Sequence, residues 1–361
     1  MIVGSISENL NIEKRVAVTP DIIKKYKSIG LQVNLSKNYA SHIGITDEQY
    51  EKEGAMIHES ENVIANSNAI LQMNILNDEN LDQLKEKQSL IGVLNPYVNK
   101  DKLSKVAAKN INCFSLDLLP RITRAQSMDI LSSQANLAGY KAVVDSFAYF
   151  QKAIPMMMTA AGTISAAKVL IVGAGVAGLQ AIATAKRMGA IVFATDVRLA
   201  SKEQVESLGG KFLIVEGAEN LETEGGYAKE TSEDFKKKQE ELLKETLKKI
   251  DIVVCTALIP GKKAPIIIKK EMIDVMPSGS IIYDLAASQG GNSELTKVDQ
   301  IIDSNGVQIM GEKNILNKLP VSASNLYSKN MFNFVNNLYD KEKKTFKINL
   351  DDEIIEKTMI K

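Results

Sequence analysis

Residues 168–198 have the sequence KVLIVGAGVAGLQAIATAKRMGAIVFATDVR, and this stretch decides the fold of the chain. An apolar run leads into Gly173, Gly175 and Gly178, and a segment with helical periodicity follows. A second apolar run then ends in Asp196. This order of strand, glycine turn, helix, strand and acid is typical of a βαβ unit that binds a dinucleotide.

Each glycine of the turn has its own expected role. Gly173 permits the tight turn, Gly175 lets the backbone approach a pyrophosphate, and Gly178 lets the helix pack closely on the strand. The free N–H groups at the helix start favour phosphates. Asp196 follows Gly178 by 18 residues, which suits an acid that accepts from the adenosine ribose. Such an acid repels a 2′-phosphate and so favours NAD over NADP, a preference that Arg198 weakens slightly. The alternative is an ordinary glycine-tightened helix turn.

Length and composition indicate a globular protein of two domains. The chain has 361 residues with 44 basic and 44 acidic side chains, so no basic excess points to nucleic acid. Cys113 and Cys255 each lie in an apolar run, which predicts buried thiols in a reducing compartment. The methionines at 156–158 are interpreted as core filler. No apolar run reaches the ~18 residues of a membrane span, and the N-terminus has no signal-peptide pattern.

Apolar runs alternate with helical segments, which predicts an α/β fold of two Rossmann-like domains with parallel sheets. The predicted first domain comprises residues 1–131 and 320–361 and has no glycine fingerprint. The second comprises residues 132–319, contains the fingerprint, and begins with a long connecting helix. We expect long helices to link the domains and a cleft to lie between them. Thr19 is the predicted N-cap of the helix that opens at Pro20.

A family resemblance extends beyond the fingerprint. The chain has LLPRITRAQSMDILSSQANLAGY at 118–140, PMMMTAAGT at 155–163, GGYAKE at 225–230 and TALIPG at 256–261. Together with the Gly173 fingerprint, these motifs resemble the NAD(H)-binding α subunit of proton-translocating nicotinamide nucleotide transhydrogenase. The resemblance covers most of the chain from Arg15 to about residue 340. It departs at 287–289, Ala-Ser-Gln, where family members often have an acid, so the residues that build the floor of the nicotinamide pocket are not assigned.

The resemblance implies a function for the whole chain. Hydride would pass directly between NADH on this chain and NADP⁺ on a partner β subunit, coupled to proton translocation through membrane subunits. It further implies a homodimer that is cytoplasmic and held at the cytoplasmic face of the inner membrane through its partners. The membrane segments would lie on separate chains.

The resemblance also assigns roles to single residues. Arg121 is expected beside the nicotinamide ribose and pyrophosphate, and Gln126 is expected to reach toward the NADP nicotinamide. Asp129 and Ser132 are expected to hold the NAD carboxamide and ribose. Beside Gly173, Gly175 and Gly178 of the glycine turn, the resemblance places adenosine-side contacts at Val176, Asp196, Val197 and Arg198. It places further pocket contacts at Gly226, Gln239 and Leu258, and a mobile loop centred on Tyr227.

The residue inventory suits a hydride transfer between two nicotinamides. Such a reaction needs alignment and exclusion of water but no proton carrier. A dehydrogenase that acts on an alcohol or amine needs a positioned acid or base, most often histidine. The chain has only His42 and His58, and we interpret both as surface or capping residues because neither lies at a predicted strand end.

Two other functions stay open. Alanine dehydrogenase is similar in fold and in the glycine turn, and Arg15 matches the arginine with which that family holds a substrate carboxylate. That family also uses a lysine and a histidine from the first domain, and the corresponding segments 70–74 and 91–96 contain neither. The third possibility is an NAD-sensing module that docks on a partner. Reduction of a hydride acceptor in the presence of partner subunits would distinguish these functions.

Overall fold

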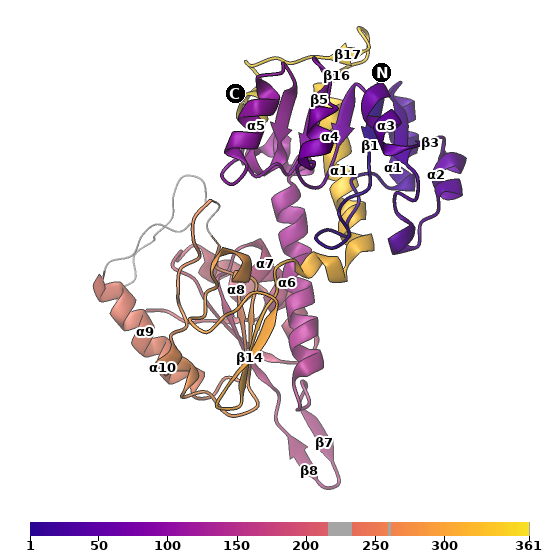
Figure 1. The fold of residues 1–361 in the computed structure, drawn as a ribbon. Helices are drawn as coiled ribbons and strands as arrows, with labels where there is room; N and C mark the ends of the chain where they lie inside the picture. The colour runs from indigo at the N-terminus through magenta and orange to yellow at the C-terminus, as the bar shows by residue number, and fades with distance from the viewer. Residues whose placement is uncertain (216–232, 259–260, 361) are drawn as a thin grey trace. The chain divides into compact units, whose positions relative to one another are not determined.

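The computed structural model describes residues 1–215, 233–258 and 261–360, and they divide into two compact units (Figure 1). The first unit comprises Met1–Gln134 and Leu316–Lys361, and the second comprises Ala135–Ile315. Helix α6 (Ile130–Tyr149) therefore begins in the first unit and continues into the second. The division falls a few residues from the expected bounds at 131 and 320.

The first unit is built on a parallel six-stranded sheet in the order β3-β2-β1-β4-β5-β6. This is the strand order of a dinucleotide-binding Rossmann sheet. Consecutive strand residues supply opposite faces, since Ile70 and Cys113 pack in one core cluster while Leu71 and Phe114 pack in another. The strands are β1 (Ile2–Ser5), β2 (Gln32–Ser36), β3 (Met56–His58), β4 (Ala69–Leu71), β5 (Ser89–Gly92) and β6 (Asn112–Ser115).

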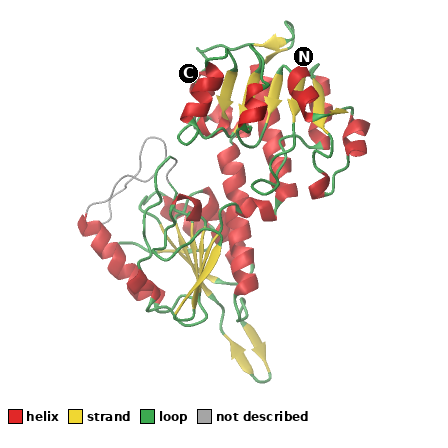
Figure 2. Cartoon of the chain, viewed as in Figure 1, coloured by secondary structure: helices red, strands yellow, loops and turns green. Residues whose placement is uncertain are grey.

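Helices cover both faces of this sheet (Figure 2). They are α1 (Pro20–Ser28), α2 (Asp47–Glu53), α3 (Ser60–Asn66), α4 (Asp78–Asp82), α5 (Lys100–Ala107), α11 (Pro320–Leu338) and α12 (Glu353–Thr358). Short 3-10 turns are η1 (Ser41–Ile43), η2 (Leu116–Leu118) and η3 (Thr123–Met128). A short hairpin, β16 (Tyr339–Asp340) with β17 (Thr345–Phe346), follows α11. The chain thus returns to its first unit through α11, whose Tyr327 and Phe334 are completely buried in the core.

Thr19 occupies the N-cap position of α1 but does not cap the helix with its side chain. Its hydroxyl pairs with the Ser328 hydroxyl of α11 at 2.8 Å. The expectation of an N-cap was therefore correct in position and wrong in bonding, because the hydroxyl bonds to the returning helix α11 instead.

The second unit contains a seven-stranded sheet in the order β11-β10-β9-β12-β13-β15-β14. All pairs are parallel except β14 with β15. The strands are β9 (Lys168–Val172), β10 (Ile191–Thr195), β11 (Lys211–Phe212), β12 (Ile252–Cys255), β13 (Ile281–Asp284), β14 (Gln300–Ser304) and β15 (Val307–Gly311). The helical segments are α7 (Val176–Arg187), α8 (Ser201–Ser207), α9 (Glu233–Leu247), α10 (Lys270–Ile273) and η4 (Ala287–Gln289). The 3-10 turn η5 (Ile315–Lys318) begins at the last residue of this unit and continues into the first. The fold therefore consists of two Rossmann-like units, as the sequence predicted, and their large sheets are parallel apart from the edge strand β14.

The methionines at 156–158 do not fill a core. Met157–Thr159 forms β7, which pairs antiparallel with β8 (Gly162–Ile164), and these strands form a separate two-stranded sheet. Met156 and Met158 are 62% and 80% exposed. The prediction was wrong because it rested on residue type, whereas these side chains lie exposed on a separate hairpin.

Both cysteines are buried free thiols, as predicted. Burial raises the pKa of Cys113 to about 12 and also raises that of Cys255. Among the described helices, none has the length and apolar character needed to cross a membrane.

Candidate functional site

The turn between β9 and α7 has the geometry that its first glycine requires. Gly173 has φ +94°, a conformation that residues with a side chain rarely adopt. Its N–H donates to Thr195 O at 2.8 Å, which ties the turn to the end of β10. A Cβ atom at this position would lie 2.8 Å from Thr256 Oγ1. Gly173 is therefore fixed by its backbone conformation and by its neighbour.

The other two glycines of the turn differ in the space around them. A Cβ on Gly178 would lie 1.9 Å from Gly173 O, so the helix approaches the turn as closely as the backbone allows. A Cβ on Gly175 would meet no heavy atom within 4 Å. Gly175 is also the N-cap of α7 and caps no N–H with a side chain. Open space beside uncapped N–H groups is what a phosphate needs.

A second helix reaches the first turn of α7. Gly139 of α6 lies so close that a Cβ there would be 2.0 Å from Ala177 O. Asn136 of the same helix donates to Gln180 Oε1 at 3.2 Å. These contacts fix the direction in which α7 leaves the turn.

Asp196 lies directly after β10, where the sequence predicted the acid. Its Oδ2 accepts from Ala174 N at 2.7 Å, so the carboxylate binds the glycine turn itself. Arg198 pairs with the same carboxylate, with Nη2 2.8 Å from Oδ2 and Nε 2.9 Å from Oδ1. The side chains of Asp196 and Arg198 are 6% and 17% exposed. This contact between the two predicted residues was not apparent from their spacing.

The end of β12 lies against the glycine turn. Thr256 Oγ1 lies 2.9 Å from Gly173 O, to which it donates. Asn292 holds the next residue, because its Oδ1 accepts from Ala257 N at 3.0 Å and its Nδ2 donates to Ala257 O at 2.8 Å. Leu258, a predicted pocket residue, follows and is 38% exposed. The ends of β9, β10 and β12 thus meet at the point where strand order reverses, the usual ligand position in such sheets.

Asp284 and Asn292 position this edge and were not assigned a role from the sequence. Asp284 is completely buried at the end of β13, and its Oδ2 accepts from Asn292 N, Ser293 N and Thr296 Oγ1 at 2.6–3.0 Å. The signal available in the sequence was an acid at the end of an apolar run, followed shortly by Gly-Gly-Asn. The departure at 287–289 forms η4, and its Gln289 Oε1 is buried without a hydrogen-bond partner among the described residues.

A separate group of predicted residues lies in the first unit, around η3 and the start of α6. Asp129 caps α6, since its Oδ1 accepts from Ser132 N at 2.9 Å and its Oδ2 from Ser132 Oγ at 2.6 Å. Arg121 and Gln126 are exposed. Capping fixes Asp129 and Ser132 relative to each other, and this structural role accounts for the pair without a ligand.

The remaining predicted residues are less closely placed. Val176 begins α7 and is 40% exposed, and Val197 lies between Asp196 and Arg198. Gln239 is half-buried on α9, a helix that packs through Leu243 and Leu247 against the sheet. Gly226 and Tyr227 lie outside the described residues.

The carboxyl edge of the first sheet carries a charged cluster in place of a glycine turn. Arg15 pairs with buried Glu13 through Nη2 and Nε at 2.7 and 2.8 Å, and its Nη1 donates to Gln134 at 2.9 Å. Burial alone would raise the pKa of Glu13, but the hydrogen bonds and charge of Arg15 leave it below the usual value. Burial raises the pKa of nearby Glu8 to about 7, although Glu8 accepts from Met73 N.

The histidines have, among the described residues, no acid–base partner of the kind that catalysis uses. His42 is exposed, and its Nε2 forms a hydrogen bond with Lys14 O at 2.8 Å. His58 ends β3, contrary to the expectation that neither histidine lies at a strand end. β3 is the outermost strand of its sheet and is far from the reversal of strand order between β1 and β4.

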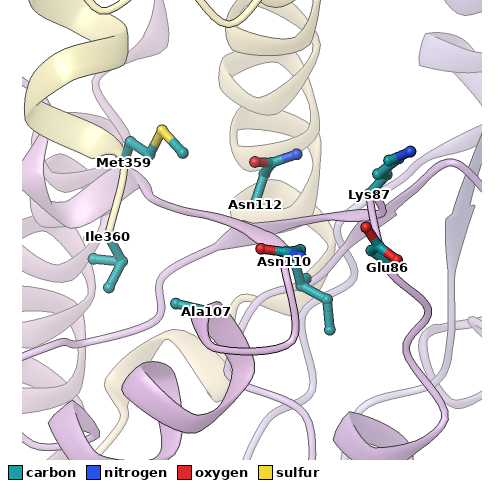
Figure 3. Close-up of a pocket in the computed structure, with 8 residues that line it drawn as sticks. Glu86, Lys87, Ala107, Asn110, Asn112, Met359 and Ile360 are labelled. Carbon is teal, nitrogen blue, oxygen red and sulfur yellow. The ribbon is translucent and has the colours of Figure 1, made fainter.

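One hollow of about 440 Å³ lies at the opposite edge of the first sheet, where β5 and β6 begin (Figure 3). It is lined by Glu86, Lys87, Ala107, Asn110, Ile111, Asn112, Met359 and Ile360. Ligands of doubly wound sheets bind at the carboxyl ends of the strands, so we assign no site to this hollow.

The chain contains two doubly wound sheets, and one of them has a glycine turn with free space at Gly175 and an acid bonded to the turn. These features define the class of dinucleotide-binding proteins. Residues 4–138 match the N-terminal and residues 142–361 the C-terminal domain model of the alanine dehydrogenase/PNT family. A Rhodospirillum rubrum protein, named as the first portion of NAD(P) transhydrogenase subunit alpha, is 45% identical over 96% of this chain and 93% of its own length. The Rickettsia prowazekii protein of the same name is 44% identical over 100% and 94%.

Solved structures agree with this relationship. Transhydrogenase from Sinorhizobium meliloti is 40% identical, with a TM-score of 0.89 over 99% of this chain and 98% of that chain. An L-alanine dehydrogenase is 18% identical with a TM-score of 0.82 over 99% and 94%, which is a likeness of fold. The chain therefore belongs to the NAD(P) transhydrogenase subunit alpha family. Nicotinamide nucleotides are the ligands of this family, and its members are named as one subunit of a larger enzyme.

Proposed function

We propose that this chain is the NAD(H)-binding subunit of a proton-translocating transhydrogenase. Hydride passes between NADH on this chain and NADP⁺ on a β subunit, and membrane subunits couple the transfer to proton movement. The observation that carries the NAD(H) assignment is the glycine turn, with open space at Gly175 and Asp196 bonded to Ala174 N. A homodimer at the cytoplasmic face of the inner membrane belongs to the same proposal.

The residues of the second unit suit the adenosine and pyrophosphate half of the nucleotide. The uncapped N–H groups at the start of α7 bind the pyrophosphate, and Gly175 leaves room for it. In this proposal, Asp196 accepts from the ribose, and Leu258, two residues after Thr256, supplies an apolar wall. Gly226, Tyr227 and Gln239 complete the pocket in this proposal.

The residues of the first unit suit the reacting half. When the nucleotide is bound, its nicotinamide supplies or accepts the hydride. Asp129 and Ser132, fixed by their own hydrogen bonds, orient the carboxamide and ribose. Arg121 binds on the pyrophosphate side, and exposed Gln126 reaches toward the second nucleotide. Alignment is the main requirement of such a transfer, so these side chains act by positioning and need not move a proton.

Arg15 bears on the alternative of amino-acid oxidation. A substrate carboxylate would have to compete with Glu13 for Nε and Nη2 and with Gln134 for Nη1. Asn74 stands in the segment where the alanine dehydrogenase family has its lysine, and its amide lies 3.4 Å from Glu8 and Glu13 oxygens. Because Arg15 and Asn74 already bond to side chains of this chain, the cluster favours a transhydrogenase over an amino-acid dehydrogenase.

The test is a titration followed by a rate measurement. The purified chain is titrated with NADH and with NADPH by calorimetry, then mixed with the NADP-binding domain of a β subunit, and hydride transfer to an NAD analogue is followed. We expect NADH-selective binding and transfer only in the mixture. Oxidation of L-alanine by the chain alone would overturn the proposal in favour of an amino-acid dehydrogenase. Selective binding without any transfer would leave a nucleotide sensor in its place.

Within that test, Gln126→Ala separates binding from transfer. We expect it to slow hydride transfer far more than it weakens NADH binding, because Gln126 is proposed to contact the second nucleotide. Equal losses in both quantities would remove Gln126 from that role.

A further inference from the structure

The Asp196 carboxylate is saturated with hydrogen bonds from within the chain. Its Oδ1 accepts from the backbone N and the Nε of Arg198 at 2.8 and 2.9 Å. Its Oδ2 accepts from Arg198 Nη2 and Ala174 N at 2.8 and 2.7 Å. A carboxylate has about four lone-pair positions, and all four are used here. A ribose hydroxyl can reach this nearly buried group only by displacing one of the donors.

The guanidinium is the donor that can leave. The N–H groups of Ala174 and Arg198 belong to turns that hold the end of β10, whereas Nε and Nη2 lie on a long side chain. These two nitrogens take one position on each carboxylate oxygen, side by side. The 2′- and 3′-hydroxyls of a ribose form a similar pair of adjacent donors. The guanidinium therefore occupies the positions that the diol needs.

We propose that Arg198 sets the nucleotide preference of this site together with Asp196. In the free chain, the guanidinium fills the two carboxylate positions that the ribose diol takes on binding. Asp196 in turn holds this cation away from a 2′-phosphate, the group that an arginine at such a position accommodates in NADP sites. Arg198 is thus a side chain that could bind a 2′-phosphate, but its charge is neutralised by Asp196. This inference rests on the proposed NAD(H) site and explains how that site discriminates.

Asp196→Asn is the variant that should release Arg198. Asparagine keeps an oxygen that can accept from Ala174 N, but it removes the charge that holds the guanidinium. We expect NADPH to bind about tenfold more tightly than to the wild type, and NADH about tenfold more weakly, since a charge-assisted hydrogen bond is gained in one case and lost in the other.

The double variant Asp196→Asn/Arg198→Gln is the matched control. Its NADPH affinity should return to within about twofold of the wild type, because the released cation is gone. Arg198→Gln alone should widen the preference for NADH over NADPH by about fivefold, since two carboxylate positions are then open to the ribose and no cation offsets the repulsion of the phosphate. Thermal unfolding of each variant verifies the fold, and Arg198→Gln decides the matter if Asp196→Asn does not fold.

Adenosine 5′-monophosphate and adenosine 2′,5′-bisphosphate repeat the cycle with probes that lack the nicotinamide. The bisphosphate should gain affinity in Asp196→Asn and lose that gain in the double variant. Equal NADPH affinities in the single and double variants, or an unchanged preference in Arg198→Gln, would overturn the inference. A wild-type chain that binds neither NADH nor NADPH would instead overturn the proposed function.

Discussion

The two sheets of this chain share one strand order at their centres, yet only one of them is expected to bind a nucleotide. The difference lies in the first connection from strand to helix. In the second unit, residues 173–175 join β9 to α7. In the first unit, residues 6–19 join β1 to α1, and they bring Glu8, Glu13 and Arg15 to the edge. Strand order alone therefore does not define a nucleotide site.

The helix starts reinforce this difference. Helix α7 follows a glycine and presents uncapped N–H groups, whereas α1 opens with Pro20, which has no N–H to donate. The Thr19 hydroxyl before it is already paired with Ser328. A phosphate is bound best where a short connection leads to free N–H groups at a helix start, whereas the first unit has the long connection 6–19 and a proline at the first position of α1.

The largest expected effect comes from filling the closest approach in the second unit. Gly178→Val should lower the free energy of unfolding by more than about 3 kcal/mol, because its Cβ would lie 1.9 Å from the carbonyl oxygen of Gly173. NADH binding should be lost with it. Chemical denaturation and calorimetry measure the two quantities.

Gly175→Ala is the matched control for that variant. Its Cβ meets no atom within 4 Å, so stability should change by less than about 1 kcal/mol. NADH affinity should still fall about tenfold if a pyrophosphate lies there. Unchanged affinity in Gly175→Ala would show that the open space is not the phosphate site.

A smaller effect is expected in the first unit from Arg15→Gln. The change leaves Glu13, whose side chain is 2% exposed, without its cation, and should lower the free energy of unfolding by about 2 kcal/mol. NADH affinity should not change, since Arg15 has no place in the proposed nucleotide site. A large loss of NADH affinity measured by calorimetry would show that the charged cluster of the first unit takes part in nucleotide binding.

The smallest effect concerns pH and Glu8. Burial raises its pKa from 4.5 to about 7 in the folded chain, so folding takes up a proton between these values. The resulting stabilisation is full below pH 4.5 and is lost as pH rises through 7. Glu8→Gln, which stays neutral, should be about 1 kcal/mol more stable than the wild type at pH 8 and nearly equal to it at pH 4. Denaturation curves with parallel pH dependence would rule out this proton uptake.

The sequence predicted the architecture well where a local rule sufficed. The glycine spacing, the apolar runs and Asp196 placed β9, α7 and β10 within a residue or two of their observed bounds. The antiparallel strand β14 was missed because QIIDS at 300–304 has only two apolar residues and so forms no apolar run. Asn305-Gly306, both with positive φ, was an available signal for the hairpin that joins it to β15.

Contacts between distant residues were harder to predict. The spacing of Asp284 and Asn292 did not reveal that the Asp284 carboxylate accepts from Asn292 N. This hydrogen bond depends on how the loop folds back on the end of β13. The prediction that the methionines at 156–158 are buried failed for a similar reason, since residue type does not determine which segment packs in a core. The roles of Arg121, Gln126, Asp129 and Ser132 came from the family resemblance alone and stay predictions.

Gly139 and Gly178 both lie against the backbone at the first turn of α7. A Cβ atom added to either glycine would lie 2.0 Å or less from a carbonyl oxygen. Every single-base change in a glycine codon that replaces the residue with another installs that Cβ atom. No single-base change that replaces either glycine is therefore possible without moving the backbone of the turn. The site is consequently closed to gradual drift there, while Asp196 and Arg198, whose side chains meet only at their ends, leave room for its nucleotide preference to evolve.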